Sequence, residues 1–498
     1  MNLPSTESGL NYPAYAMNET SLQYDKGTII IRGIKPPNSV YDERVGCYRG
    51  AAMYYQMIKE YLDNSNLPYS DDVLHLILCP DLKLISNSDV VLRYYQKEAI
   101  NAWVSAGLRG TIALPTGAGK TILGIFAMCA VNASALVVVP TIDLLYQWKR
   151  EIEKNIQTEV GIVGGGEKEI KPITVITYDS CYLMASEIGN KFKLVIFDEV
   201  HHLGGEGYAT MAEMLACPHR LGLTATYERH DGRHTVVDRL VGGKVYEIKI
   251  EELEGTYLAE YDYKLIKLDM MPDEKKNYDT YYDRYRKLAS ELKLNGAEGF
   301  KKMIMLSVSD ASAREALVCR NKARDIAFNS EAKLAALESL LRKHKYDRII
   351  IFTEHNKLVH RISRTLLIPS ITYETPPKER EYNLESFRNG IFTRMVTSKV
   401  LDEGVDVPEA NVGIILSGSG SAREYKQRLG RILRMKEGKE AVMYEIVTTG
   451  TSEVGTSIRR HSETKTAVSR VPLAAACNGS NGNNTATSVA AFPNTQGE

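Results

Sequence analysis

LPTGAGKT, residues 114–121, indicates an α/β fold, because it has the form of a phosphate-binding loop between a strand and a helix. Gly117 and Gly119 let the backbone curl so that its N–H groups face a phosphate chain at the start of the helix. Lys120 would reach the outer phosphates, and the Thr121 hydroxyl would bind Mg²⁺. The strict pattern has glycine where Leu114 stands. A glycine-rich helix start with an exposed lysine is therefore the competing interpretation.

Short apolar runs alternate with helical patterns around this loop, from residue 91 to about 248. The runs have the length of strands, are rich in β-branched residues and are almost unbroken, as in parallel strands that are buried on both faces. They lie at 110–114, 135–139, 173–177, 194–197 and 220–223. The alternation predicts a doubly wound α/β domain at 90–250.

The same alternation returns later and predicts a second α/β domain at 331–455. Its predicted strands lie at 348–352, 394–397, 412–416 and 441–446, and its predicted helices at 331–343, 357–367 and 378–389. The intervening 251–330 is predicted to be a linker followed by a helical pair, and within it 273–325 holds 12 basic and 9 acidic residues.

The two ends of the chain differ from these domains. Residues 1–89 are predicted to form a small α+β domain, with a strand at 28–34 and a helix at 54–62. Tyrosines in this domain could stack on bases, although such side chains more often belong to a core; the candidates are Tyr41, Tyr48, Tyr54 and Tyr55. Residues 456–498 end in a segment rich in Asn, Gly, Ser and Thr, for which we predict disorder.

The composition is that of an ordinary globular protein, with 498 residues and 62 Lys+Arg against 62 Asp+Glu. A net charge of zero excludes binding of nucleic acid through bulk basicity, so any such binding needs a local groove. No two of the seven cysteines lie within 30 residues of each other, which argues against a zinc ribbon or a disulfide framework. No apolar run approaches the ~18 residues of a membrane span, and no secretory signal is visible. We therefore expect a cytoplasmic protein without a membrane partner.

A second motif, DEVH at 198–201, directly follows the apolar run at 194–197. A carboxylate at the end of a strand, in the same domain as a phosphate loop, is suited to holding Mg²⁺. Asp198 would have this role, and Glu199 would orient and deprotonate the attacking water. A solvated loop start is the alternative interpretation of such a pair.

A third motif, QRLGRILR at 427–434, lies in the second α/β domain. Arg431 and Arg434 are three residues apart and would share one face of a helix. Two guanidinium groups from another domain can stabilise the charge that develops on a transferred phosphoryl group. The alternative is a basic amphipathic helix without a catalytic role.

Together with TAT at 224–226 and LDEGVDVP at 401–408, these motifs stand in the order found in superfamily 2 helicases and translocases. LRYYQ at 92–96 resembles their Q motif, and VVVPTIDLLYQW at 137–148 resembles the motif whose Pro-Thr turn touches the nucleic-acid backbone. IIIFTEH at 349–355 fits the opening strand of a second RecA-like domain. The resemblance covers about 90–450 and implies two tandem RecA-like domains with parallel sheets.

The resemblance also implies the cofactors, ATP and Mg²⁺, and a role for each motif residue. Residues that would hold the nucleotide are Gln96, at the adenine edge, and Thr116, Gly117, Ala118, Gly119, Lys120 and Thr121. Mg²⁺ would be bound by Thr121 and Asp198. The catalytic set would be Lys120, Asp198, Glu199, Gln427, Arg431 and Arg434. Coupling and DNA contact would fall to Pro140, Thr141, Thr224, Ala225, Thr226, Gly404 and Asp406.

Further details resemble the XPB-type DNA helicases of the archaeal branch, above all GLTATYERHDGR at 222–233 and the residues around 427–434. In that family an R-E-D tripeptide follows the TAT motif, and here Arg229, His230 and Asp231 stand in its place, so the histidine departs from the pattern. The segment 273–325 occupies the position of the family's thumb-like insertion. YDKGTIIIRG and YDERVGCYRG, at 24–33 and 41–50, are similar to its damage-recognition domain.

This resemblance implies an ATP-dependent 3′–5′ DNA helicase of nucleotide excision repair or transcription. It would act on single-stranded and forked DNA, with a partner endonuclease or a transcription and repair complex, and would be associated with the nucleoid in an archaeal cell. A double-strand DNA translocase that remodels complexes without separating strands is the main competing function. A nucleic-acid-binding scaffold with a regulatory ATP site is a further alternative, against which the intact Lys120, Asp198, Glu199, Arg431 and Arg434 argue. An RNA helicase is a lesser alternative.

Overall fold

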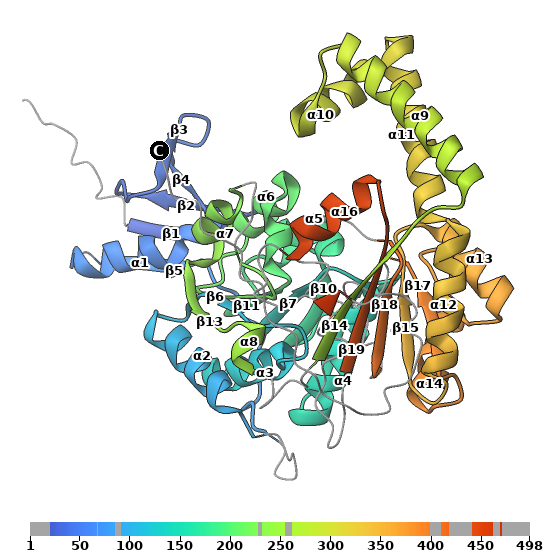
Figure 1. Cartoon of the computed structure of the whole chain (residues 1–498). Helices are drawn as coiled ribbons and strands as arrows, with labels where there is room; N and C mark the ends of the chain where they lie inside the picture. Colours follow the sequence, from blue (N-terminus) through green and yellow to red (C-terminus); the bar gives the residue numbers. More distant parts are fainter. Residues whose placement is uncertain are drawn as a thin grey trace, which may run out of the picture. The chain divides into compact units, whose positions relative to one another are not determined.

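The computed structural model describes residues 20–66, 68–84, 91–227, 232–253, 261–398, 410–417, 441–461 and 469–470. These residues fall into two compact units, one up to residue 253 and one from residue 261 onward, and each is described by itself (Figure 1). Within the described residues, no helix is long and apolar enough to cross a bilayer.

The N-terminal residues fold into the small α+β layer that the sequence predicts. Its strands are β1 (Thr20–Asp25), β2 (Thr28–Arg32), β3 (Ser39–Asp42), β4 (Cys47–Ala51) and β5 (Tyr69–Asp72), in the order β3-β4-β2-β1-β5. A short 3₁₀ turn (Ala52–Tyr54) leads into α1 (Tyr55–Asn64), which packs on the sheet. Tyr55 is buried in this core and its hydroxyl donates to Asp71, so it is not available for base stacking, whereas Tyr41 is half exposed.

This small layer shares its packing with the α/β domain that follows. The Tyr24 hydroxyl donates to the carbonyls of Ala185 (3.1 Å) and Met214 (3.2 Å), and Met53 belongs to the larger domain's core. The backbone N–H groups of His75 and Ile77 donate to carbonyls at 190 and 191. The predicted boundary at residue 89 therefore separates two sheets that remain in close contact.

The first α/β domain is a sheet in the order β13-β6-β12-β11-β7-β10-β8-β9, in which neighbours pair in parallel except at β9. Its strands are β6 (Arg109–Ala113), β7 (Ala135–Val139), β8 (Val160–Gly164), β9 (Glu167–Lys168), β10 (Ile173–Thr177), β11 (Leu194–Asp198), β12 (His219–Thr224) and β13 (Lys244–Glu247). All five predicted runs are strands. The strands that the sequence did not predict are the polar edge β13 and the glycine-bounded hairpin β8–β9.

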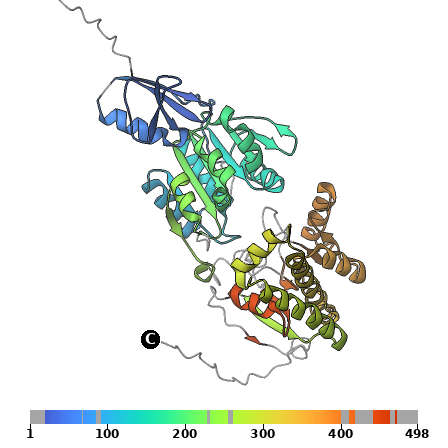
Figure 2. The same ribbon diagram turned by 90° about the horizontal axis from the view of Figure 1, so that it is seen from above.

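Helices cover both faces of this sheet (Figure 2). They are α2 (Tyr94–Ser105), α3 (Lys120–Val131), α4 (Ile142–Asn155), α5 (Tyr178–Ile188), α6 (Glu206–Glu213), α7 (His234–Val241) and the short α8 (Ile250–Leu253). Val195 and Phe197 of β11 pack with α5, α6 and α7, while Ile196 points toward α3, as the two-residue period of a strand requires. The doubly wound prediction is confirmed.

The second unit is built on another parallel sheet, in the order β16-β17-β15-β18-β19-β14-β20. Its strands are β14 (Tyr261–Leu268), β15 (Ile349–Phe352), β16 (Ser370–Ile371), β17 (Arg394–Thr397), β18 (Val412–Ile415), β19 (Ala441–Thr448) and β20 (Ser469–Arg470). Its helices are α12 (Glu331–Lys343), α13 (Asn356–Leu366), α14 (Pro377–Arg388) and α16 (Ser452–His461).

Two boundaries differ from the predictions for this unit. β14 lies inside the predicted linker and thumb at 251–330, yet it pairs with β19 over its whole length. Its sequence, YDYKLIKL, alternates apolar and charged residues and so lacks the apolar run by which the other strands were predicted. α16 and β20 extend into the tail at 456–498, for which disorder was predicted.

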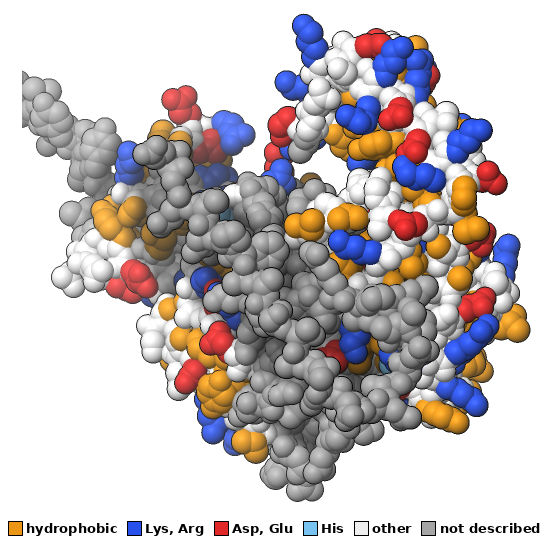
Figure 3. All heavy atoms as spheres, viewed as in Figure 1, with side chains coloured by type: hydrophobic (Ala, Val, Ile, Leu, Met, Phe, Trp, Pro, Cys, Tyr) orange, Lys and Arg blue, Asp and Glu red, His pale blue; other side chains and the backbone are white. Residues whose placement is uncertain are grey.

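The thumb-like segment consists of α9 (Pro272–Glu291), α10 (Gly296–Leu306) and α11 (Ala311–Phe328). α9 leads away from the sheet and α11 returns alongside α9, with α10 at the far end (Figure 1). Arg284 of α9 forms a two-pronged ion pair with Glu315 of α11, at 2.8 and 3.0 Å. Lys and Arg are interspersed with Asp and Glu over these helices (Figure 3). The segment thus has three helices where the sequence predicted a pair. α10 was not predicted because Gly296 and Gly299 interrupt its helical pattern.

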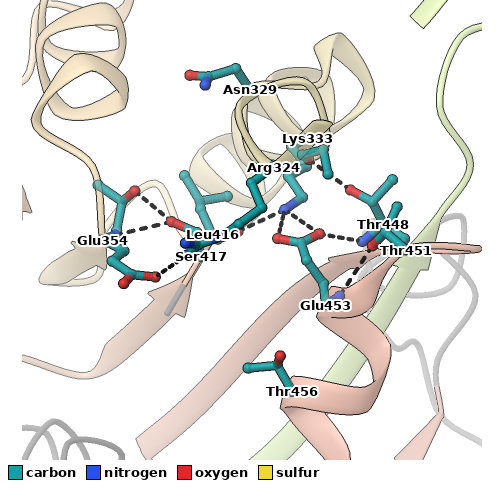
Figure 4. Close-up of polar contacts among 12 residues, drawn as sticks. Arg324, Asn329, Lys333, Glu354, Leu416, Ser417, Thr448, Thr451, Glu453 and Thr456 are labelled. Carbon is teal, nitrogen blue, oxygen red and sulfur yellow. Dashed lines mark hydrogen bonds and ion pairs between the residues drawn. The ribbon is translucent and has the colours of Figure 1, made fainter. Parts of the chain in front are cut away.

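A buried ion pair joins α12 to α16 in the second unit, close to the last turn of α11 (Figure 4). Lys333 Nζ lies 2.6 and 2.8 Å from the two carboxylate oxygens of Glu453 and donates to the Leu416 carbonyl at 2.9 Å. The side chains of the pair are 2% and 6% exposed. Thr448 N–H donates to Glu453, and the Thr448 hydroxyl donates to the Ala327 carbonyl in the last turn of α11. Burial lowers the pKa of Lys333, and the Glu453 carboxylate opposes this shift.

Candidate active site

Four of the predicted motifs meet at one edge of the first sheet. β6, β12, β11 and β7 are neighbours in this order and run parallel. The segments that follow them are 114–121, 224–226, 198–199 and 140–141, respectively. The carboxyl ends of parallel strands lie at the same edge, which is where open α/β sheets bind their ligands. The fold therefore brings the phosphate-loop, TAT, DEVH and Pro-Thr motifs together.

The phosphate loop has the backbone that its sequence predicts. Gly117 and Gly119 have φ angles of 85° and 82°, in the left-handed region that favours glycine. A Cβ atom on Gly119 would lie 2.4 Å from the side-chain nitrogen of Gln96. α3 begins at Lys120, so its free N–H groups lie at the end of the loop. The Thr116 hydroxyl is buried and has no hydrogen-bond partner among the described residues. This curled loop with an unused hydroxyl fits a phosphate chain.

Gln96 holds the shape of the loop. Its side-chain amide donates to the Ala118 carbonyl at 2.9 Å, and its Oε1 accepts from the Arg93 N–H at 2.9 Å. The Tyr95 hydroxyl donates to the same Ala118 carbonyl at 3.0 Å. With 4% of its surface exposed, Gln96 acts here on the loop backbone, and its contact with adenine stays a prediction.

The two carboxylates that the sequence predicts to be catalytic lie beside the lysine of the loop. Lys120 Nζ is 3.0 Å from Glu199 Oε1, with the two side chains 12% and 11% exposed. Asp198 Oδ1 accepts from the Glu199 N–H at 3.0 Å, and its Oδ2 accepts from Trp148 Nε1 at 2.8 Å. Burial, together with the neighbouring Glu199 carboxylate, raises the pKa of Asp198 to about 6, while Lys120 and the indole N–H oppose the shift. Low dielectric surroundings strengthen each of these interactions.

Glu199 has a strained backbone, with φ of 47° and ψ of 55°. Non-glycine residues in this left-handed region are uncommon and often belong to functional sites. The kink ends β11 and leads into a 3₁₀ turn (Val200–Gly204). His201, buried in this turn, places Nδ1 at 3.5 Å from Glu199 Oε2. Glu199 thus lies between a lysine and a histidine at the edge of the sheet.

The Thr224 side chain stabilises the TAT turn from within. Its hydroxyl donates to the Thr226 carbonyl at 2.9 Å and accepts from the Thr226 N–H at 3.2 Å, so the turn closes around Ala225. The Thr224 carbonyl accepts from the Leu114 N–H at 2.9 Å. A shift of the TAT turn would therefore reach the phosphate loop through one backbone hydrogen bond.

Pro140 and Thr141 form the entry to α4. The Thr141 hydroxyl accepts from the Leu144 N–H at 3.3 Å, the arrangement of a helix N-cap. Trp148, two turns further along the same helix, also lies at the site, although its sequence context predicted no role for it. The sequence alone places Trp148 in an amphipathic helix of the domain that contains the phosphate loop. It does not predict the contact with Asp198, because the two residues are 50 positions apart.

Several predicted residues lie outside the described part of the chain. They are Arg229, His230, Asp231, Gly404, Asp406, Gln427, Arg431 and Arg434. Their roles stay predictions. The residues that are described fit both expected cofactors, because the loop matches a phosphate chain and because Thr121 and Asp198 carry the hard oxygen donors that Mg²⁺ prefers.

Comparison with known proteins places this site in a class. Three family models match successive parts of the chain: the Xeroderma pigmentosum group B helicase damage recognition domain at 22–73, the Type III restriction enzyme res subunit at 89–229, and the ERCC3/RAD25/XPB C-terminal helicase at 312–463. Their order, on two parallel sheets with a phosphate loop in the first, defines a superfamily 2 helicase.

Individual relatives narrow the class. The chain is 43% identical over 441 residues to DNA 3'-5' translocase XPB2 of Sulfurisphaera tokodaii, a match that covers 88% of this chain and 99% of the relative. The chain belongs to the XPB family of DNA helicases. It is 27% identical over 410 residues to the transcription and DNA repair factor IIH helicase/translocase subunit XPB/SSL2 of Saccharomyces cerevisiae, covering 76% of this chain and 44% of that protein. The solved Hef helicase domain of Pyrococcus furiosus matches 73% of this chain and 97% of its own at a TM-score of 0.47 and 17% identity.

Proposed function

We propose that this chain is an ATP-driven DNA motor that tracks 3′–5′ and opens duplex DNA at a single-strand junction or fork. The Lys120–Glu199 pair beside Asp198 carries the proposal, because it combines a phosphate-binding lysine, a water-activating carboxylate and a Mg²⁺ ligand at one sheet edge. The name of the Sulfurisphaera relative, a DNA 3'-5' translocase, supports the substrate and the direction.

In this proposal, the loop N–H groups and Lys120 bind the phosphate oxygens of ATP. Lys120 would exchange its Glu199 partner for phosphate, which frees the Glu199 carboxylate to orient a water molecule and accept its proton. Thr121 and Asp198 would hold Mg²⁺, which supplies neutralisation of phosphate charge. Arg431 and Arg434, with Gln427, would complete the site from the second RecA-like domain.

Coupling to DNA would use the loops that share the sheet edge. The Pro140–Thr141 turn would touch the nucleic-acid backbone, and the residues at 224–226 would report the state of the ATP site through the Leu114–Thr224 hydrogen bond. Gly404 and Asp406 would act from the second domain, and the residues at 229–231 would contact DNA near a strand junction.

The wider setting is proposed from the relatives. The yeast relative is a subunit of a general transcription and DNA repair factor, which supports a role here in nucleotide excision repair or transcription, with a partner endonuclease or larger complex. Residues 1–89 would recognise distorted DNA, and α9–α11 would act as the thumb. The place of action would be the DNA in the cytoplasm, at the nucleoid of an archaeal cell.

A strand-displacement assay tests this proposal. Wild-type protein, ATP and a forked duplex with a 3′ tail should release a labelled strand, and Lys120→Ala should not. The second candidate is a double-strand translocase, because the name of the Sulfurisphaera relative says translocase. If the protein displaces the third strand of a triplex but does not release a strand from the fork, it is a double-strand translocase. Release of neither strand would contradict both forms of the proposal.

A further inference from the structure

Trp148 ties the orientation of the Asp198 carboxylate to the position of α4. The indole is completely buried, and its N–H donates to Asp198 Oδ2 at 2.8 Å. The other oxygen, Oδ1, accepts from the Glu199 N–H at 3.0 Å. A carboxylate has about four lone-pair directions, so these two bonds fix its plane and leave lone pairs for a further partner. Because a buried indole N–H needs an acceptor, α4 and Asp198 are held together.

The same indole packs against the helix that carries the loop lysine. A Cβ atom on Gly124 of α3 would lie 2.5 Å from Cη2 of Trp148 and 3.1 Å from Cζ3, so the ring occupies the space that a larger residue would need. α3 begins with Lys120 and Thr121. Trp148 therefore contacts both the helix of one proposed Mg²⁺ ligand, Thr121, and the side chain of the other, Asp198.

The beginning of α4 lies at the proposed nucleic-acid contact. Thr141 caps the helix, and Trp148 follows seven residues later, about 10 Å along the axis at 1.5 Å per residue. Leu144, Leu145 and Ile152 bury the same face of α4 in the domain core, so the helix packs as one rigid element. A shift at its first turn consequently reaches the indole.

We infer that Trp148 is a positioning residue, which orients Asp198 for Mg²⁺ and transmits nucleic-acid contact at the start of α4 to the metal site. This inference rests on the proposed function, because it requires ATP, Mg²⁺ and DNA as ligands. It adds to that proposal a residue that touches none of the three and acts through Asp198.

The test replaces the indole and keeps a buried aromatic ring, in Trp148→Phe. Trp103→Phe is the matched control, because Trp103 is the other of the chain's two tryptophans, is equally buried, and donates its N–H to the Arg220 backbone carbonyl at 3.0 Å. We expect the Mg²⁺ concentration for half-maximal binding of a fluorescent ADP analogue to rise about 10- to 100-fold in Trp148→Phe and to stay unchanged in the control. Equal Mg²⁺ dependence in the two variants would overturn the inference.

A second readout leaves Trp148 intact. In Trp103→Phe, the only remaining tryptophan is Trp148, so addition of Mg²⁺ to the protein with saturating ADP should change the emission of that indole. In Trp148→Phe, the remaining Trp103 should not respond. An unchanged emission from Trp148 would contradict a link between the indole and the metal site, whether or not Trp148→Phe folds.

DNA stimulation of ATP hydrolysis distinguishes a failure of the proposed function from a failure of the inference about Trp148. Wild-type protein that hydrolyses ATP at the same rate with and without DNA would contradict the proposed function. The Mg²⁺ titration would still test whether Trp148 positions Asp198. If the wild type is stimulated and Trp148→Phe keeps both its stimulation and its Mg²⁺ affinity, only the inference about Trp148 is wrong.

Discussion

Replacement of Lys333 by methionine should destabilise the second unit strongly, because it breaks the buried pair with Glu453. Lys333 makes three hydrogen bonds at 2.6 to 2.9 Å, and its removal leaves Glu453 buried with the Thr448 N–H as its remaining backbone donor among the contacts described. Removal of one partner of such a pair costs about 3–5 kcal/mol. At about 2–4 °C per kcal/mol for a unit of this size, the midpoint temperature of the second unit should fall by roughly 6–20 °C.

Calorimetry on the full chain measures this effect, with an exposed pair on the same helix as control. Arg342 of α12 lies 3.2 Å from Glu338, but the two side chains are 81% and 43% exposed. Arg342→Met should therefore change stability by less than about 0.5 kcal/mol.

The double variant Lys333→Met/Glu453→Gln isolates the pair itself. Glutamine removes the buried charge and keeps an oxygen for the Thr448 N–H, so the double variant should be more stable than Lys333→Met alone. A loss in Lys333→Met no larger than that in Arg342→Met, or a double variant that loses the sum of both single effects, would refute this reasoning.

Three further predictions concern the ATP site. Glu199→Gln should bind ATP as the wild type does but hydrolyse it about 10²- to 10⁴-fold more slowly, and equal rates would exclude Glu199 as the base. Arg434→Ala should lower kcat far more than ATP affinity, whereas a loss of DNA binding alone would contradict an arginine finger. With the Asp198 pKa near 6, protonation competes with Mg²⁺ at low pH, so Mg²⁺ affinity should fall about fourfold from pH 7.5 to pH 5.5; constant affinity over this range would argue against Asp198 as the ligand.

The fold was predictable wherever local patterns determine it. Buried parallel strands such as 135–139 and 173–177 are almost unbroken runs of apolar and β-branched residues, and the structure has strands with these same limits. Glycines mark the phosphate loop, where φ is positive at Gly117 and Gly119. β14 was missed because its alternating polarity is not that of a strand buried on both faces, and α10 was missed because two glycines interrupt its pattern.

Such local patterns do not predict contacts between residues that are distant in the sequence. Lys333 and Glu453 are 120 residues apart, and each alone resembles a solvated helix charge. Trp148 and Asp198 are 50 residues apart, and only the neighbouring positions of α4 and β11 bring them together. The candidate site was thus predicted as a set of motifs, while the residue that orients one of its carboxylates emerged from the packing.

If the chain is a DNA-driven motor, DNA stimulates ATP hydrolysis at the site that contains Lys120. The most direct measurement is the steady-state ATPase rate of wild type and Lys120→Ala without nucleic acid and with single-stranded DNA, duplex DNA or RNA. We expect strong stimulation by DNA in the wild type, weaker stimulation by RNA, and loss of activity under all conditions in Lys120→Ala. A wild-type rate that is indifferent to nucleic acid, or a Lys120→Ala variant that retains DNA-stimulated hydrolysis, would contradict this expectation.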